Sequence, residues 1–400
     1  MNNTILNYSL KRMTSGFCST AAIACFLLGA SDAFAQTSYA VTDLGVLPNK
    51  EESVPAAING QGQVAGTSSA KTSGEAAFRY NPYNPVPMED IGQSVISRGF
   101  GINNTGLVVG DSALNTASSA AFPVRHAALF TNGSVIDLGT LNGQTFSRAN
   151  GINGLNQVVG FSGPELDNPK GRAFFWSKST GMVDVGTLGG AYAQAFAIND
   201  SGFITGNSQT ASSATGGAAV HAFLGPSPLR AGAIGMRDLG TLDGSFSYGM
   251  SINTNSHVVG YSTVNKVDSR VHAFWFDGNA MKDLGTLAPS SSNPLEDQSF
   301  ALGVNSADQV VGYTYLPGPN ANTDPAIQPG TSPVSQVAFV WSQGVMKDLN
   351  TLIGSAAQKY HLNSAIAIND NGQIVASALS KATGARRAVL LKPISPLPSR

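Results

Sequence analysis

Cysteine is almost missing from this chain, because its 400 residues contain only Cys18 and Cys25. Both lie within the first 35 residues, a segment that we expect to be removed during export. The mature protein would then contain no disulfide and no cysteine-bound metal. Packing and hydrogen bonds alone would have to stabilise its fold.

Charged residues and long apolar runs are also scarce. Only 12% of residues are Asp, Glu, Lys or Arg, and the formal net charge is −1, so the chain lacks the basic character that attracts nucleic acid. The apolar run over residues 17–30 is shorter than the roughly 20 residues of a membrane-spanning helix, and no later run is of this kind. We therefore expect no nucleic-acid partner and no membrane insertion.

The first 35 residues have the features of an export signal. Lys11 and Arg12 precede the apolar run, and Ala33-Phe34-Ala35 supplies the small residues of a cleavage site. We predict cleavage before Gln36 and a bacterial protein that is secreted or periplasmic. A lipoprotein anchored at Cys25 is the alternative, although the three residues before this cysteine lack the leucine that is expected there.

One unit of sequence is present in seven copies between residues 43 and 389. Each copy contains D-[LIV]-[GN], a strand of small residues that ends in [IV]-N, a V-V-G-like run, and a run that contains Ala and usually Phe. The repeat asparagines are Asn59, Asn103, Asn153, Asn199, Asn253, Asn305 and Asn369. The repeat aspartates are Asp43, Asp90, Asp137, Asp184, Asp238, Asp283 and Asp348. The repeat alanines are Ala77, Ala127, Ala173, Ala222, Ala273, Ala338 and Ala388.

These elements predict an all-β chain. A turn-forming Asn, a position that tolerates positive φ and then β-branched residues are typical of a hairpin, and four strands in each of seven copies give 28 strands. Runs such as Phe174-Phe175-Trp176 are apolar on consecutive residues, so both faces of each small sheet must be covered. Repeat spacings of 44 to 65 residues suit four-stranded blades. We predict a seven-bladed β-propeller over residues 36–394 and a short tail over 395–400, with an open β-solenoid as the alternative.

The two ends of the repeat array indicate a closed ring. The chain enters the array at a D-L-G strand (39–46) and leaves it at an Ala-containing strand (386–392), so only together do the ends complete the seventh copy. Residues two and four positions before the repeat Asn are small in six copies, which suits the crowded strand nearest the axis. We predict the order small-residue strand, V-V-G strand, Ala strand and D-L-G strand from inside to outside. The N-terminal strand then closes the last blade as its outer edge.

Two copies carry the tripeptide His-Ala-Phe, as His221-Ala222-Phe223 and His272-Ala273-Phe274. Together with the D-L-G-T-L run from Asp238, Ile252-Asn253 and Val258-Val259-Gly260, these motifs resemble the bacterial HAF family of probable extracellular repeats. The resemblance covers residues 39–392 and implies export and a repeat architecture, but no particular reaction. In four other copies the first His is replaced, by Ala76, Arg172, Val337 and Arg387. This His is therefore no ligand common to all repeats.

The repeat aspartates and the histidines near them favour a structural role. A position filled by Asp in all seven copies indicates a rule of the fold, in which the carboxylate accepts turn or cross-strand hydrogen bonds. His126, His221 and His272 share one register beside the Asp of their own repeat, and each lies in a different blade, so we predict His–Asp pairs and no metal site. No recognised catalytic or cofactor motif is present, so we assign no catalytic residue and no cofactor.

Function should lie where the repeats differ. The longest insertions are 316–336, 288–298 and 353–363. The predicted strand order places all three on one face, here called the long-loop face, which carries the connections between blades and between second and third strands.

The candidate binding residues lie where the chain enters the inner strands on the long-loop face. They are Arg98, Phe146, Arg148, Tyr192, Gln194, Phe246, Tyr248 and Phe300. Aromatic faces with guanidinium and amide donors suit sugars or peptides, whereas packing of the aromatics between blades is the competing interpretation. We predict a monomeric, non-catalytic scaffold that binds an extracellular glycan, peptide or surface partner. A propeller hydrolase or lyase acting on extracellular polysaccharide is the alternative.

Overall fold

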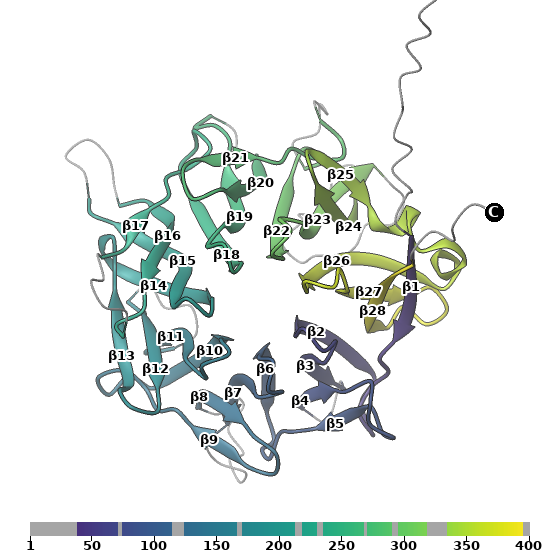
Figure 1. Ribbon diagram of the computed structural model, residues 1–400, viewed down its shortest axis with the longest axis horizontal. Helices are drawn as coiled ribbons and strands as arrows, with labels where there is room; N and C mark the ends of the chain where they lie inside the picture. Colours follow the sequence, from purple (N-terminus) through teal and green to yellow (C-terminus); the bar gives the residue numbers. More distant parts are fainter. Residues whose placement is uncertain are drawn as a thin grey trace, which may run out of the picture. The chain divides into compact units, whose positions relative to one another are not determined.

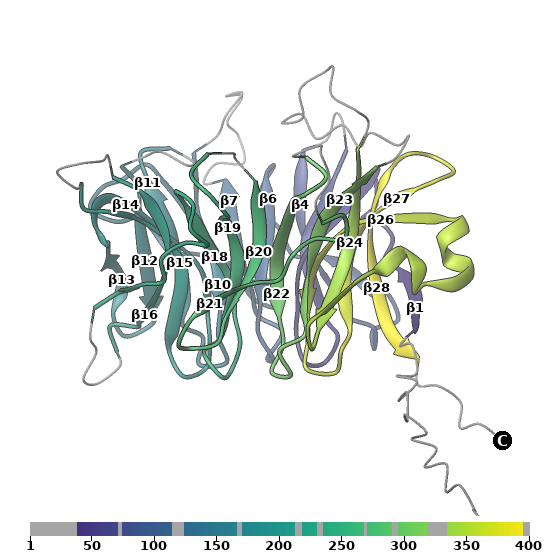
Figure 2. The same cartoon turned by 90° about the horizontal axis from the view of Figure 1, so that it is seen from above.

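The computed structural model describes residues 38–70, 74–113, 124–165, 170–212, 218–229, 235–267, 270–289, 295–317 and 334–394. The expected export signal and tail, and most of the 316–336 insertion, lie outside the described residues. The described chain forms seven antiparallel sheets of four strands each around a common centre (Figure 1). The strands run between the two faces of the ring (Figure 2). This arrangement confirms the predicted seven-bladed β-propeller.

The strands of each blade follow one another from the centre outwards. Blade 1 contains β2 (Glu52–Ile58), β3 (Val64–Ser69), β4 (Glu75–Tyr80) and β5 (Met88–Asp90), and blade 2 contains β6 (Ser97–Ile102), β7 (Val108–Ala113), β8 (Arg125–Phe130) and β9 (Val135–Asp137). Blade 3 contains β10 (Phe146–Ile152), β11 (Val158–Gly163), β12 (Arg172–Ser177) and β13 (Gly181–Gly186), and blade 4 contains β14 (Gly189–Ile198), β15 (Phe203–Thr210), β16 (Val220–Pro226) and β17 (Arg237–Asp238).

The remaining three blades repeat this order. Blade 5 contains β18 (Ser247–Ile252), β19 (Val258–Thr263), β20 (Val271–Phe276) and β21 (Met281–Asp283), and blade 6 contains β22 (Ser299–Val304), β23 (Val310–Pro317), β24 (Val334–Ser342) and β25 (Val345–Asp348). Blade 7 contains β26 (Tyr360–Ile368), β27 (Ile374–Ser380), β28 (Arg386–Ile394) and, at its outer edge, β1 (Ser38–Asp43). Two short 3₁₀ helices, η1 (Leu349–Thr351) and η2 (Gly354–Gln358), precede β26. The insertion 353–363 is thus η2 and the start of an inner strand, rather than an irregular loop.

Strand β1 joins the two ends of the array. It pairs antiparallel with β28, from Ser38 opposite Ile394 to Asp43 opposite Val389, and Figure 1 shows the two strands side by side. The last blade therefore takes three strands from the end of the array and one from its beginning. This pairing confirms the predicted closure of the ring by the N-terminal strand.

A ring of asparagine side chains links the seven inner strands. The Nδ2 of each repeat Asn donates to the backbone carbonyl of the repeat Asn in the next blade at 2.9 to 3.2 Å, and Asn369 completes the circle by donating to Asn59. The same side chain caps its own turn, as when Asn153 Oδ1 accepts from the N–H groups of Leu155 and Gln157 at 3.1 and 3.0 Å. All seven side chains are buried, so each bond is shielded from water.

Small residues allow the blades to approach one another near the axis. A Cβ added to Gly101 would lie 3.0 Å from Val109 Cγ2 and 3.1 Å from the carbonyl oxygen of Asn150 in the next blade. On the neighbouring strand, a Cβ on Gly110 would collide with the carbonyl oxygen of Arg98. The small positions therefore lie between strands and between blades, while the residue between them on the inner strand faces the axis.

The core lies between the blades rather than in one central mass. The Phe that follows the repeat Ala is fully buried in all five copies that have it, namely Phe78, Phe174, Phe223, Phe274 and Phe339. One cluster joins Val109 and Ala127 of blade 2 to Val158 and Phe174 of blade 3. Because truncation of a buried Phe to Ala typically costs about 3–5 kcal/mol, each of these five side chains contributes strongly to the stability of its own blade.

Removal of residues 36–48 should damage the opposite end of the chain. The deletion takes away β1 and exposes the backbone groups of β28, so we expect a lower melting temperature and aggregation. Transfer of the same segment to the C-terminus through a short Gly-Ser linker should restore the melting temperature measured by calorimetry. An unchanged melting temperature in the deletion variant would contradict closure by β1.

Candidate functional site

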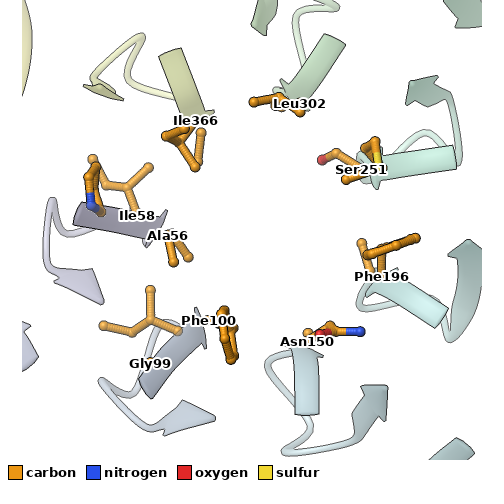
Figure 3. Close-up of a pocket in the computed structure, with 18 of the residues that line it drawn as sticks. Ala56, Ile58, Gly99, Phe100, Asn150, Phe196, Ser251, Leu302 and Ile366 are labelled. Carbon is orange, nitrogen blue, oxygen red and sulfur yellow. The ribbon is translucent and has the colours of Figure 1, made fainter. Parts of the chain in front are cut away.

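A central cavity of about 680 Å³ is lined by inner strands from all seven blades. Figure 3 looks into it and shows Ala56, Phe100, Asn150, Phe196, Leu302 and Ile366 around a common opening. Each of these residues stands three positions before a repeat Asn, between the two small positions, and Met250 is the seventh of the set. The size of the central cavity and its mixture of apolar and polar lining residues are typical of a small-molecule site.

The two ends of the axial channel carry charge of opposite sign. Among the described residues that line the large cavity, the charged ones are Arg98, Arg148 and Arg386 together with Glu75. A second cavity of about 250 Å³ lies at the asparagine ring, and its charged lining residues are Asp200 and Asp370. The two cavities share the apolar residue that precedes the repeat Asn in six blades. Anionic groups on a ligand are therefore favoured at the arginine end.

The repeats also differ in one layer near the arginine end, here called the variable layer. It consists of the residue five positions before the repeat Asn and its cross-strand partner on the second strand. The pairs are Val54 with Thr67, Arg98 with Asp111, Arg148 with Phe161, Gln194 with Asn207, Tyr248 with Tyr261, Phe300 with Tyr313 and Ser364 with Ser377. Five of the eight predicted binding residues belong to this layer.

Blades 1 to 3 form the charged part of the variable layer. Arg98 bridges to Glu75 of blade 1 at 2.6 Å, and Arg148 Nε donates to Asn150 Oδ1 at 3.0 Å. Asp111 is fully buried, and its nearest cationic atom is Arg125 Nε at 3.9 Å. Within the described part of the chain, neither carboxylate oxygen of Asp111 accepts a hydrogen bond.

The buried carboxyl of Asp111 depends on its basic neighbours. Burial raises its pKa, and the charges of Arg125, Arg98 and Arg148 oppose that rise. Arg125 also lies over the ring of Phe146, with 5.6 Å from its guanidinium carbon to the ring centroid. Sequence reasoning missed Asp111, although a charged residue directly after V-V-G departs from the repeat and could have signalled it.

Aromatic side chains form the part of the variable layer in blades 5 and 6. Tyr248 stacks on Tyr261 with ring centroids 5.1 Å apart, and Phe300 of the next blade contacts Tyr261 at 5.1 Å and stacks on Tyr313 at 4.7 Å. Phe246 contacts Tyr248 edge-on at 5.8 Å. These contacts hold the rings between strands and between blades, so they contribute to packing as well as to the surface near the channel.

The predicted binding residues fall into two groups. Arg98 and Arg148 line the large cavity, whereas the other six are not among its lining residues. Phe146 packs against Phe161, which also contacts Tyr192 at 6.1 Å, and the Tyr192 hydroxyl donates to the buried Gln194 at 2.9 Å. The structure therefore brings two of the eight to the channel, and ligand binding by any of them stays a prediction.

The repeat aspartates all cap the turn that follows them. In each copy one carboxylate oxygen accepts from the backbone N–H two residues later, at 2.7 to 2.9 Å. The predicted His–Asp pairs are also present, with Nδ1 to carboxylate distances of 3.0 Å for His126–Asp137 and 2.8 Å for His221–Asp238 and His272–Asp283. Both observations confirm the structural interpretation.

Blade 5 adds a second carboxylate to its His–Asp pair. Asp297, from the 288–298 insertion, is buried and lies 3.3 Å from His272 Nε2 and 2.9 Å from Arg270 Nη1. Burial alone would lower the pKa of His272, but its hydrogen bond to Asp283 and the charges of Asp283 and Asp297 raise it overall. Sequence reasoning placed Asp297 in a loop and could not bring it to His272, which lies on another element.

Among the residues that the structure describes there is no group of three or more His, Cys, Asp or Glu side chains placed to hold a metal ion. No helix within the described ranges has the length and apolar character needed to cross a membrane.

Comparison with known proteins gives a family and a fold. The model of a family described as "Protein of unknown function (DUF3466)" matches residues 189–389, just over half of the chain, so the chain belongs to this family. Among solved structures it is similar to the β-propeller domain of the Trilobed protease from Pyrococcus furiosus, with a TM-score of 0.52, 10% identity and coverage of 88% of this chain and 97% of that one. That domain is described as having an open velcro topology. No curated protein matches the sequence.

Stability should depend on pH through His272. Because its folded pKa lies above that of an unfolded His, the stabilisation is fully present below about pH 6.5 and is lost as the pH rises through the folded pKa. We expect the difference in unfolding free energy between wild type and His272→Gln to be larger at about pH 5.5 than at about pH 9, measured by urea unfolding. Asp297→Asn should reduce this pH dependence. An equal difference at both pH values would refute the role of the raised pKa.

Proposed function

We propose that this member of the DUF3466 family is an exported, non-catalytic propeller that binds an extracellular glycan, peptide or surface partner on its long-loop face. The observation that carries the proposal is the central cavity, whose arginine end adjoins the variable layer. In the variable layer several blades carry charged or aromatic residues that differ from one blade to the next. The asparagine ring and the aspartate caps are the same in all blades.

The chemistry of this end suits recognition of a ligand. Arg98 and Arg148 come from adjacent inner strands, and both line the cavity. Guanidinium groups donate several hydrogen bonds in a fixed plane, which favours carboxylate, hydroxyl and carbonyl oxygens. Arg98 is held by Glu75 and Arg148 by Asn150, so both donors are oriented before a ligand arrives.

A propeller hydrolase or lyase acting on polysaccharide is less well supported. Glycoside hydrolysis typically uses two carboxyl groups about 5–9.5 Å apart that both reach the substrate. Among the described residues that line the large cavity, Glu75 is the single carboxylate, and it is bonded to Arg98. The similar protease propeller shares a fold with this chain at 10% identity, which carries no argument for catalysis here.

Paired loss of the two arginines should weaken binding. Glycan and peptide arrays probed with the mature protein identify ligands, and isothermal titration then compares wild type with Arg98→Gln/Arg148→Gln. Because a hydrogen bond to a charged group contributes about 1.5–3 kcal/mol, we expect Kd to rise by about 10-fold to 100-fold. The arginines are preferred to the aromatic residues because they line the cavity; since they also offset the burial of Asp111, the melting temperature of the double variant is measured beside its Kd.

A charge-matched control separates this effect from general electrostatics. Lys347 is exposed on β25, the outer strand of blade 6, and Lys347→Gln should bind as wild type does. Unchanged binding by the double arginine variant would refute the channel end as the site. Release of shortened oligosaccharides from an array ligand would favour the enzyme instead.

Export is proposed from the first 35 residues and has its own test. The small residues before Gln36 form the cleavage site, so mass spectrometry of the native protein should find Gln36, or its pyroglutamate, at the N-terminus. The same measurement on periplasmic and medium fractions would locate the product. Recovery of the protein with residues 1–35 still attached would overturn the proposal.

A further inference from the structure

A third cavity, of about 470 Å³, lies between blades 1 and 2 and shares no lining residue with the two cavities of the channel. Its lining comes mainly from the turns that join first to second and third to fourth strands, including Asn84, Thr105 and Asn132. In an antiparallel blade these turns lie at the end opposite to the long-loop face. We call this cavity the blade 1–2 groove.

Arg79 gives the groove a fixed floor. Its guanidinium donates to Glu89 Oε1 at 2.6 Å within blade 1, and to the carbonyl oxygen of Gly106 and to Asn132 Oδ1, both at 2.8 Å, in blade 2. The side chain is only 14% exposed. The two walls of the groove are thus joined by one largely covered cation, so the polar groups around it are already in place before a ligand binds.

The loop that borders the groove is longer than four of its equivalents. Residues 81–87 join β4 to β5 with seven residues, whereas the corresponding turns in blades 2, 3, 5 and 6 have two to four. Pro82, Pro85 and Pro87 restrict its backbone, and a hydrogen bond of 2.6 Å from Asn81 N–H to the Pro87 carbonyl closes it. A loop of this kind loses little conformational entropy when it binds a ligand.

This rigid loop presents an aromatic ring to solvent. Tyr83 is 78% exposed; it is not itself a lining residue, but Asn81 and Asn84 on either side of it in the loop both line the groove. Its backbone N–H donates to Asn81 Oδ1 at 3.2 Å, so its position in the loop is fixed. An exposed aromatic contributes little to the stability of the fold, whereas beside a polar groove it offers a flat apolar face to a ligand.

The lining selects the class of ligand. Amide, hydroxyl and carboxylate groups predominate, with Ile91 as the one large apolar residue among those lining the groove. An anion is disfavoured because Glu89 and Asp90 border the groove and the guanidinium of Arg79 already donates to three acceptors. A ligand rich in uncharged hydroxyl groups, with an apolar ring face to set against Tyr83, meets both conditions.

We propose that the blade 1–2 groove binds a neutral oligosaccharide, with Tyr83 stacking on one sugar ring and the amide side chains bonding to its hydroxyls. This site is independent of the channel end proposed above. A protein with both sites could hold a neutral glycan at one face while it engages a second partner at the other.

Calorimetric titration of the mature protein with neutral hexasaccharides tests the proposal. The probes are the β-1,4-glucose, β-1,4-xylose and α-1,4-glucose hexamers, with an oligogalacturonate hexamer as the anionic comparison. We expect at least one neutral hexamer to bind with a Kd below about 1 mM, and the anionic hexamer to bind more weakly than it to the Arg98→Gln/Arg148→Gln variant, in which the cationic channel end is removed. Tyr83→Ala should raise that Kd at least about 10-fold, and Tyr83→Phe, which keeps the ring, should change it less than about threefold.

Two controls keep the result specific. Val267 is 98% exposed in blade 5, and Val267→Ala should leave binding unchanged. The Arg98→Gln/Arg148→Gln variant should also bind the neutral hexamer as wild type does, so loss at the groove and loss at the channel are distinguishable. The proposal is overturned if no neutral hexamer binds at about 1 mM, if Tyr83→Ala binds as wild type, or if the arginine variant alone loses binding.

Discussion

The hydrogen bond from each repeat asparagine to the next blade is the interaction on which the ring depends. One side chain performs two tasks, because its oxygen caps the turn of its own hairpin and its nitrogen reaches the neighbouring carbonyl. Aspartate would keep the cap but lose the donor, and serine is too short to do both. Asn at this position therefore serves both its own turn and the contact with the next blade. At the outer edge of blade 7, the pairing of β1 with β28 closes the ring as well.

Some positions of the repeat hold the same residue type in nearly all blades, whereas others differ from blade to blade. The asparagine ring, the aspartate caps and the small residues of the inner strands recur in every blade or nearly so, and they account for turns, spacing and close approach. In the variable layer and the blade 1–2 groove, the requirements of turns, spacing and close approach do not determine which residue is present. In the variable layer, Asp111 is buried among arginines at a position that holds an aromatic ring in three other blades. Burying a carboxylate costs free energy, and nothing in the repeat requires an acidic residue at this position. A role in binding would explain it.

Much of the fold could be predicted from the sequence, because the same pattern of strand and turn residues is present in seven copies. Hairpin turns, strand order and the split blade follow from residues that are near in sequence or equivalent by repetition. The sites could not be predicted in the same way, because they depend on neighbours from different blades. Asp297 reaches His272 across a loop, Arg79 reaches Asn132 from another blade, and Arg98 meets Glu75 across a blade boundary. The aromatic candidates show the same difficulty, since spacing alone does not tell a ring that packs between blades from one that faces a ligand.

The central claim is that the asparagine bonds make the seven blades one cooperative unit, and Asn153→Asp tests it most directly. This variant keeps an oxygen to cap the turn but removes the donor to the Asn199 carbonyl. Hydrogen exchange followed by mass spectrometry measures the opening free energy of each inner strand in the variant and in wild type. If the ring opens as one unit, the opening free energy should fall by about 1–3 kcal/mol in the inner strands of all seven blades. A loss confined to blades 3 and 4, with the other five unchanged, would contradict this claim.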